Sequence, residues 1–215
     1  MRYVNAIPWL AASAMLVSGC GNLTSLSQSP APAESAPAAA NAAPIVDPAI
    51  QKAYDAALQA LKDGHTEQAR RGFLALAKSN ADLGGPHANL GLILRRSGNL
   101  AAAASEFEQA THINPMQPQY FNQLGITYRQ MGQFQKAREA YEQAIKLDPD
   151  YAEAQLNLGI LLDLYLWNGE QALLHYERYL ALSPGGDDVV GKWIIDLKNR
   201  VGRKKPVSVS RMEEQ

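Results

Sequence analysis

Cysteine is almost absent from this 215-residue sequence: Cys20 is the only one, so no disulfide can form within a single chain. Aromatic residues make up 7% of the sequence and charged residues 19%. The 20 basic side chains nearly balance the 21 acidic ones, and they form no extended stripe along the chain. This balance argues against a nucleic-acid partner, and the lack of cross-links leaves packing as the source of stability.

The residue patterns of common catalytic and metal sites are also missing. No glycine-rich phosphate loop and no Gly-x-Ser-x-Gly turn occurs. The histidines are scattered, and none stands at metal-ligand spacing from another histidine or a cysteine; they are His65, His87, His112 and His175. The adjacent carboxylates of Asp187 and Asp188 are better explained as a helix cap than as a catalytic pair. We therefore expect a protein that is not an enzyme and that needs no cofactor, no metal and no small-molecule substrate.

One apolar run stands near the N-terminus, at residues 6–17, after the positive charge of Arg2. It is too short to span a bilayer comfortably, which is typical of a secretion signal. The run ends in Val17-Ser18-Gly19-Cys20, a sequence that resembles the lipobox of bacterial lipoproteins. The alternative is an ordinary secreted protein whose thiol happens to lie near the cleavage site.

The lipobox resemblance implies that residues 1–19 are a signal peptide, cut off after Gly19, and that Cys20 carries lipid. Stable anchoring needs more than one acyl chain, and a triacylated cysteine satisfies that need. In the similar lipoproteins, aspartate directly after the cysteine favours retention in the inner membrane. Gly21 stands there instead, so we expect a lipid anchor in the outer membrane of a bacterial envelope, with the protein facing the periplasm.

Residues 20–48 are rich in alanine, proline and serine and contain no aromatic residue. Such a segment cannot bury enough apolar surface to fold, and its prolines interrupt any helix that the alanines favour. We expect a disordered tether that displays the folded part away from the membrane.

The sequence contains a clear internal repeat. The pair Leu90-Gly91 returns 34 positions later as Leu124-Gly125, and again as Leu158-Gly159. A second pattern pairs alanine with an aromatic residue four positions on, at Ala69/Phe73, Ala103/Phe107, Ala137/Tyr141 and Ala172/Tyr176. A spacing of four puts both side chains on one helical face, so we expect the small residue to let the neighbouring helix approach and the rings to fill the space between adjacent hairpins. A period of this length predicts stacked helical hairpins rather than one closed globule.

Turn glycines at 64, 98 and 132 and helix-ending prolines at 115, 149 and 184 complete a pattern that resembles the tetratricopeptide repeat. The resemblance implies an all-α fold, a right-handed superhelical solenoid of about four helical hairpins. It covers residues 49–185, in units near 50–83, 84–117, 118–151 and 152–185. The first unit departs from the pattern, with Ala57 in place of the helical glycine. The last carries one extra residue between Leu164 and Gly169, which predicts a lengthened turn with Trp167 near the surface or against the next helix.

A solenoid exposes an apolar end unless something covers it. Residues 186–202 are predicted to form a capping helix, because four apolar residues share one helical face: Val190, Trp193, Ile194 and Leu197. Gly202 is the expected end of this helix, and residues 203–215 are expected to be a disordered tail. In a second interpretation, Trp193 anchors a partner.

In the tetratricopeptide family the first helix of each unit lines a concave surface that binds partners, and three rows of residues are expected there. The first row is Asn89, Gln123 and Asn157; the second is Leu92, Ile126 and Ile160; the third is Arg95, Arg129 and Asp163, with Arg96 beside it. Carboxamides can hold the backbone of an extended peptide, and arginines can hold a carboxylate. The alternative is that these are merely solvated positions on helices.

The resemblance to the family's clamp for a C-terminal carboxylate is incomplete, because Tyr54 and Asp55 stand where a lysine and an asparagine are wanted. An internal peptide segment remains a possible occupant. We expect a non-catalytic envelope lipoprotein that binds an envelope protein or peptide segment and acts as an adaptor or scaffold, held to the membrane by its lipid. The alternative is a structural, pilotin-like assembly factor for a pilus or a secretin.

Overall fold

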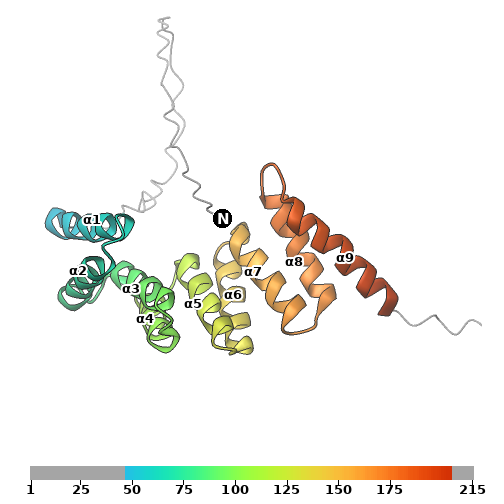
Figure 1. The fold of residues 1–215 in the computed structure, drawn as a ribbon, viewed down its shortest axis with the longest axis horizontal. Coiled ribbons are helices and arrows are strands. Elements are labelled where there is room, and N and C mark those ends of the chain that lie inside the picture. The colour runs from blue at the N-terminus through green and yellow to red at the C-terminus, as the bar shows by residue number, and fades with distance from the viewer. Residues whose placement is uncertain (1–46, 205–215) are drawn as a thin grey trace, which may run out of the picture. The chain divides into compact units, whose positions relative to one another are not determined.

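The computed structural model describes residues 47–204, which form nine α-helices and no strand (Figure 1). They are α1 Pro48–Lys62, α2 Thr66–Ser79, α3 Gly84–Arg96, α4 Leu100–Ile113, α5 Pro118–Gln130, α6 Phe134–Leu147, α7 Ala152–Leu164, α8 Gly169–Leu182 and α9 Asp188–Lys204. The predicted signal peptide, Cys20, nearly all of the tether and residues 205–215 of the tail lie outside the described residues. The predicted all-α, superhelical fold is confirmed.

The first eight helices pack as four hairpins, α1 with α2, α3 with α4, α5 with α6 and α7 with α8, and each hairpin packs on the next. The first helices of neighbouring hairpins also touch, because α3 contacts α5 and α5 contacts α7. Among the described helices, the second members of the hairpins make no comparable contacts with one another. The first helices therefore lie side by side, and we call the surface that they share the inner face.

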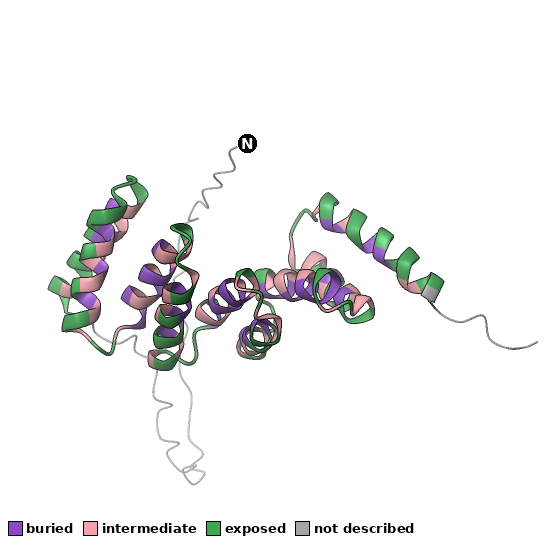
Figure 2. Cartoon of the chain, turned by 60° about the horizontal axis from the view of Figure 1, so that its bottom comes forward, coloured by how far each residue is buried: buried purple, intermediate pink, exposed green. Residues whose placement is uncertain are grey.

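A row of four aromatic rings, one in each hairpin, is buried as the sequence predicts. The rings of Phe107, Tyr141 and Tyr176 lie inside their own hairpins against a glycine of the paired helix, rather than only between adjacent hairpins, and Phe73 belongs to a separate core cluster. Phe73, Phe107 and Tyr141 are 0% exposed and Tyr176 is 1% exposed. Figure 2 shows buried positions recurring on the sides where helices meet, with exposed positions opposite. Burying each ring contributes about 1.5–3 kcal/mol, so the row is a main source of stability.

The repeated helical glycines make room for these rings. A β-carbon added to Gly91 would lie 2.9 Å from the ring of Phe107, and one on Gly125 would lie 2.6 Å from the ring of Tyr141. The same holds for Gly159, at 2.7 Å from Tyr176. These distances are below van der Waals contact, so glycine is required for the helices to approach this closely.

The first hairpin also has a close contact at a glycine, but here the glycine lies on the second helix. Ala57 of α1 stands where the later repeats have glycine, and α2 has a glycine opposite it, Gly72. A β-carbon on Gly72 would lie 2.9 Å from the β-carbon of Ala57. The departure of this unit from the pattern is therefore compensated across the helix pair.

The turns inside the first three hairpins have three residues, and the middle one is a glycine with positive φ: Gly64 at 83°, Gly98 at 83° and Gly132 at 74°. The fourth turn has four residues, Tyr165 to Asn168, and Trp167 takes the positive value with a φ of 54°. The predicted lengthened turn is confirmed, and so is the surface position of Trp167, which is 77% exposed. A left-handed conformation costs a residue with a β-carbon about 1–2 kcal/mol.

Helix α9 covers the end of the last hairpin with Val190, Ile194 and Leu197, which are all buried. Asp187 caps it, because its Oδ1 accepts hydrogen bonds from the backbone N–H of Val189 at 2.9 Å and of Val190 at 3.2 Å. The bond from Val190 lowers the pKa of the Asp187 carboxyl. This confirms the interpretation of the Asp187-Asp188 pair as a cap.

Two expectations for α9 were wrong. The helix does not end at Gly202 but continues to Lys204, because Gly202 is not among the glycines that adopt positive φ and end helices. Trp193 does not share the burial of its three predicted companions. It is 40% exposed, with its ring 5.8 Å from that of Tyr176.

Candidate partner-binding face

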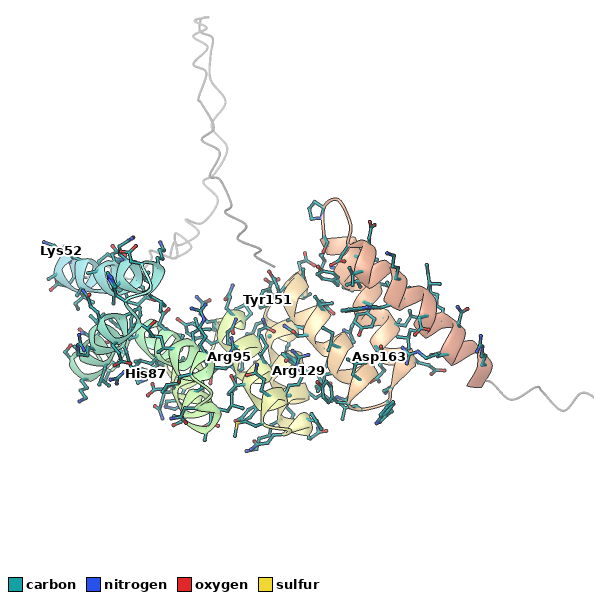
Figure 3. All side chains as sticks on the ribbon, in the orientation of Figure 1. Lys52, His87, Arg95, Arg129, Tyr151 and Asp163 are labelled. Carbon is teal, nitrogen blue, oxygen red and sulfur yellow. The ribbon has the colours of Figure 1, made fainter. Side chains whose placement is uncertain are left out.

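The predicted binding residues all lie on helices that form the inner face, α3, α5 and α7. Figure 3 shows Arg95, Arg129 and Asp163 following one another along the repeats, one from each of these helices. Most of the predicted residues are half-buried; Arg96 is exposed and Asp163 is buried. The structure therefore brings the three rows onto neighbouring helices.

The amide of Asn89 is held by the preceding repeat. Its Nδ2 donates to the hydroxyl of Tyr54 at 2.7 Å and to the carbonyl of Gly85 at 3.0 Å. Burial raises the pKa of Tyr54, so this hydroxyl stays neutral at ordinary pH. Asn89 thus has its donors engaged, and within residues 47–204 no group donates to its Oδ1.

Asn157 makes the equivalent cross-repeat contact through a residue that the sequence analysis missed. Its Nδ2 donates to Oδ1 of Asn122 at 3.0 Å, and Asn122 donates in turn to the hydroxyl of Tyr151 at 3.1 Å. Asn122 is only 2% exposed. The signal that could have found it is a separation of 35 residues, which Asn122 and Asn157 share with Tyr54 and Asn89.

Gln123, the middle amide of the row, is bound to Arg95. The Nη2 of Arg95 donates to Oε1 of Gln123 at 2.7 Å, and its Nη1 donates to the backbone carbonyl of Gln123 at 3.3 Å. The same guanidinium lies 5.7 Å from the centre of the Phe107 ring. Arg95 therefore joins the second and third repeats as well as lying on the inner face.

Three arginines concentrate positive charge on the inner face. Burial lowers the pKa of Arg95, and the nearby charges of Arg96 and Arg129 act in the same direction. No carboxylate within residues 47–204 forms an ion pair with any of the three. Burial also raises the pKa of Tyr141 to about 12, and the charge of Arg129 is the strongest influence in the other direction.

The negative charge of Asp163, at the end of the arginine row, is balanced by an arginine of α9. Arg200 approaches Asp163 Oδ1 with Nη1 at 3.1 Å and donates from Nη2 to Oδ2 at 3.2 Å. Asp163 is 6% exposed, whereas the Arg200 side chain is 46% exposed. This pair joins the capping helix to α7. The sequence did not predict the role of Arg200, because nothing local indicates a contact with a residue 37 positions away.

The apolar row contributes only part of its surface to the inner face. Leu92, Ile126 and Ile160 are half-buried and pack against the main core. They therefore offer part of each side chain to a partner, beside the arginines and amides.

Residues 47–204 contain no group of three or more His, Cys, Asp or Glu side chains that could hold a metal ion. None of the described helices combines the length and the hydropathy that crossing a bilayer requires.

This arrangement of hairpins defines a tetratricopeptide solenoid, and comparison with known families agrees. A tetratricopeptide repeat model matches residues 54–118, and a TPR repeat model matches residues 127–162. The chain therefore contains tetratricopeptide repeats, which are modules that bind protein or peptide partners. A comparison with curated protein sequences found no match.

Solved structures with the same fold include a MamA fragment from Desulfovibrio magneticus RS-1, with 17% identity and a TM-score of 0.63, covering 73% of this chain and 87% of that chain. PilF from Pseudomonas aeruginosa has 21% identity and a TM-score of 0.63, with 72% of each chain covered. YrrB, described as a TPR protein with an unusual peptide-binding site, has 20% identity and a TM-score of 0.58, covering 69% and 75%. At these identities the similarity extends to the fold alone.

Proposed function

We propose that this chain is a non-catalytic adaptor that binds an extended segment of a partner protein across its inner face. The observation that carries the proposal is the cluster of Arg95, Arg96 and Arg129, which has no ion-paired carboxylate within the described residues. Like charges held together, with Arg95 desolvated, favour an anionic group from outside the chain. Acidic side chains of a partner supply that charge.

The amide row and the apolar row complete the recognition surface. Asn89 has an acceptor oxygen available, and Gln123 has an amide nitrogen that no described residue engages. These groups can pair with the backbone of an extended segment regardless of its side chains. The half-buried faces of Leu92, Ile126 and Ile160 then contact apolar side chains of the partner.

The proposal also gives the adaptor its place in the cell. The sequence at Cys20 resembles a lipobox, and Gly21 follows it in place of aspartate. A lipid on Cys20 anchors the chain in the outer membrane, with the repeats in the periplasm and an envelope protein as the partner. No nucleic acid and no small-molecule substrate take part.

The inner face is tested by removing its charge in the full chain. Cells producing Arg96→Glu with Arg129→Gln are treated with a crosslinker, and captured proteins are quantified by mass spectrometry. We expect recovery of the partner to fall by about tenfold or more, the effect of losing about 1.4 kcal/mol of binding free energy. The melting temperature should stay close to that of the unmodified chain, because neither arginine forms an ion pair with a described carboxylate.

The matched control is Arg71→Glu with Lys146→Gln, which changes the net charge equally at exposed positions on α2 and α6. This variant should capture as much partner as the unmodified chain. Equal recovery from the inner-face variant would refute the proposed site. Equal loss from both variants would mean that net charge, and not the inner face, governs the association.

The anchor is tested in the same cells by Cys20→Ser. The unmodified chain should incorporate a labelled fatty acid and sediment with outer-membrane fractions, whereas the variant should do neither, because it lacks the thiol that receives the lipid. An unmodified chain found unlabelled in the soluble fraction would contradict the lipoprotein assignment while leaving the inner face untouched.

A second candidate function is that of a structural, pilotin-like assembly factor. The observation in its favour is the exposure of two tryptophans near the C-terminal end, Trp167 at 77% and Trp193 at 40%. In this case substitutions of the tryptophans would disturb assembly of a pilus or secretin, and the inner-face variant would not.

A further inference from the structure

Trp167 adopts a backbone conformation that is unfavourable for its residue type. The other three hairpin turns have glycine at positive φ, and Trp167 takes that place at 54°. Its indole is 77% exposed, so burial of the ring does not offset the backbone strain. A strained residue whose side chain adds little to the fold points to a contact with something outside the chain.

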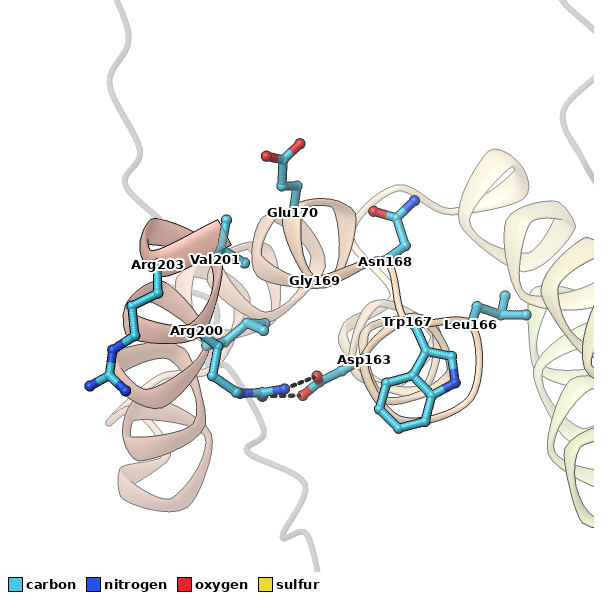
Figure 4. Close-up of a pocket in the computed structure, with 10 residues that line it drawn as sticks. Asp163, Leu166, Trp167, Asn168, Gly169, Glu170, Arg200, Val201 and Arg203 are labelled. Atoms are coloured by element: carbon cyan, nitrogen blue, oxygen red, sulfur yellow. Dashed lines mark hydrogen bonds and ion pairs between the residues drawn. The ribbon is translucent and has the colours of Figure 1, made fainter. Parts of the chain in front are cut away.

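Trp167 forms one wall of a cavity of about 870 Å³ between the last hairpin and α9 (Figure 4). Val201 of α9 lies on the opposite side, Leu197 of the same helix also lines the cavity, and the Asp163–Arg200 pair lies between Trp167 and Val201. A β-carbon on Gly169 would lie 3.0 Å from both Leu197 and Val201. The start of α8 therefore packs directly on α9, and the side chains of Leu197 and Val201 give the cavity an apolar side.

The charges around the cavity cancel. Two acidic residues, Asp163 and Glu170, and two basic ones, Arg200 and Arg203, line it. Arg200 is already paired with Asp163 and with Asp196. An uncharged occupant is thus favoured over an acidic or a basic one, because neither sign of charge gains a net attraction.

The groups that face the cavity suit an aromatic ring. The indole of Trp167 can stack with one, and the planar guanidinium of Arg200 stacks on aromatic faces as well. Both side chains remain open to solvent, Trp167 at 77% and Arg200 at 46%. The cavity can therefore admit a side chain that projects from a larger molecule, and tryptophan and arginine are the residues enriched where protein interfaces bind most strongly.

We propose that this cavity is a second binding site, which receives an uncharged aromatic side chain of a partner protein between Trp167 and α9. It is separate from the arginine cluster of the inner face and uses different chemistry. The inserted turn residue of the last repeat creates the site, because it places Trp167 in the lengthened turn, where it lines the cavity across from α9.

The test uses the full chain, labelled with ¹⁵N and with ¹³C methyl groups, and the uncharged aromatic probe N-acetyl-tyrosine amide. The chain has three tryptophans, so the indole N–H signal of Trp167 can be followed by itself. We expect this signal and the methyl signals of Leu197 and Val201 to move saturably with the probe. The indole signal of Trp193 should move less.

Trp167→Gly is the informative variant, because glycine suits positive φ and the fold is kept. We expect the methyl signals of Val201 to need at least about tenfold more probe in this variant, which corresponds to losing about 1.4 kcal/mol of affinity. Met116→Ala is the matched control, because it removes another large apolar side chain, 75% exposed, from a turn outside the cavity. Its titration should match that of the unmodified chain.

Three results would overturn the proposal: no movement of the Trp167 signal, an equal response to N-acetyl-aspartate amide or to N-acetylglucosamine, or an unchanged Val201 response in Trp167→Gly. The inner-face variant Arg96→Glu with Arg129→Gln should still bind the probe. Failure here and failure of the proposed adaptor function are therefore distinguishable.

Discussion

Replacing Phe107 by alanine is expected to lower the free energy of unfolding by about 3–5 kcal/mol. The ring is 0% exposed and fills the space beside Gly91, between α3 and α4. The guanidinium of Arg95, which bonds Gln123 of the next repeat, also lies against this ring. The substitution therefore removes packing inside one hairpin and support for its contact with the next.

The measurement is urea unfolding followed by far-ultraviolet circular dichroism. Leu174→Ala is the control, because this leucine is an apolar residue of α8 that is 65% exposed, and its loss should cost less than about 1 kcal/mol. The transition of Phe107→Ala should also broaden, since repeats on either side of a weakened hairpin can unfold separately. If both variants unfold at the same urea concentration, the aromatic row does not hold the repeats together.

Gly125→Ala is expected to destabilise the chain by about 1–3 kcal/mol, although alanine is the better helix former. The added β-carbon would lie 2.6 Å from two atoms of the Tyr141 ring, which is itself 0% exposed. Relief of the clash requires α5 and α6 to separate, and this weakens the packing of the third hairpin.

Gly191→Ala is expected to have the opposite effect on the stability of the same chain. Gly191 lies inside α9, and a β-carbon there would meet no atom within 4 Å. Helix propensity then acts alone, and the substitution should stabilise by up to about 1 kcal/mol. The two variants are compared by melting temperature. A rise in both would show that the glycine of the repeat is not required by the ring opposite it.

The fold could be predicted from the sequence because each repeat carries the same local residue pattern. Leu-Gly pairs and alanine-aromatic pairs recur at one spacing, and each depends only on residues within one hairpin or its neighbour. The extra residue before Gly169 predicted the altered turn for the same reason. The end of α9 was misjudged because a glycine can continue a helix as well as end one, and only its φ decides.

The candidate site was predicted less completely. The sequence placed Asn89, Gln123 and Asn157 on one face, but not the bonds that engage their amides. Those bonds depend on the rotation of one repeat against the next, which brings Tyr54 and Asn122 within reach. Such rotations are set by packing across the whole hairpin and leave no signature in a single helix.

The contact of Ala57 with Gly72 in the first hairpin has a wider consequence for how these repeats diverge. At that contact the two helices share a fixed space, and either one can supply the smaller residue. A repeat can thus lose the expected glycine and keep its geometry, provided that the facing position on the other helix of the hairpin carries a smaller residue. When a repeat is compared with the family pattern one helix at a time, its structural difference is overstated. Repeats are better compared by the two helices of each hairpin together.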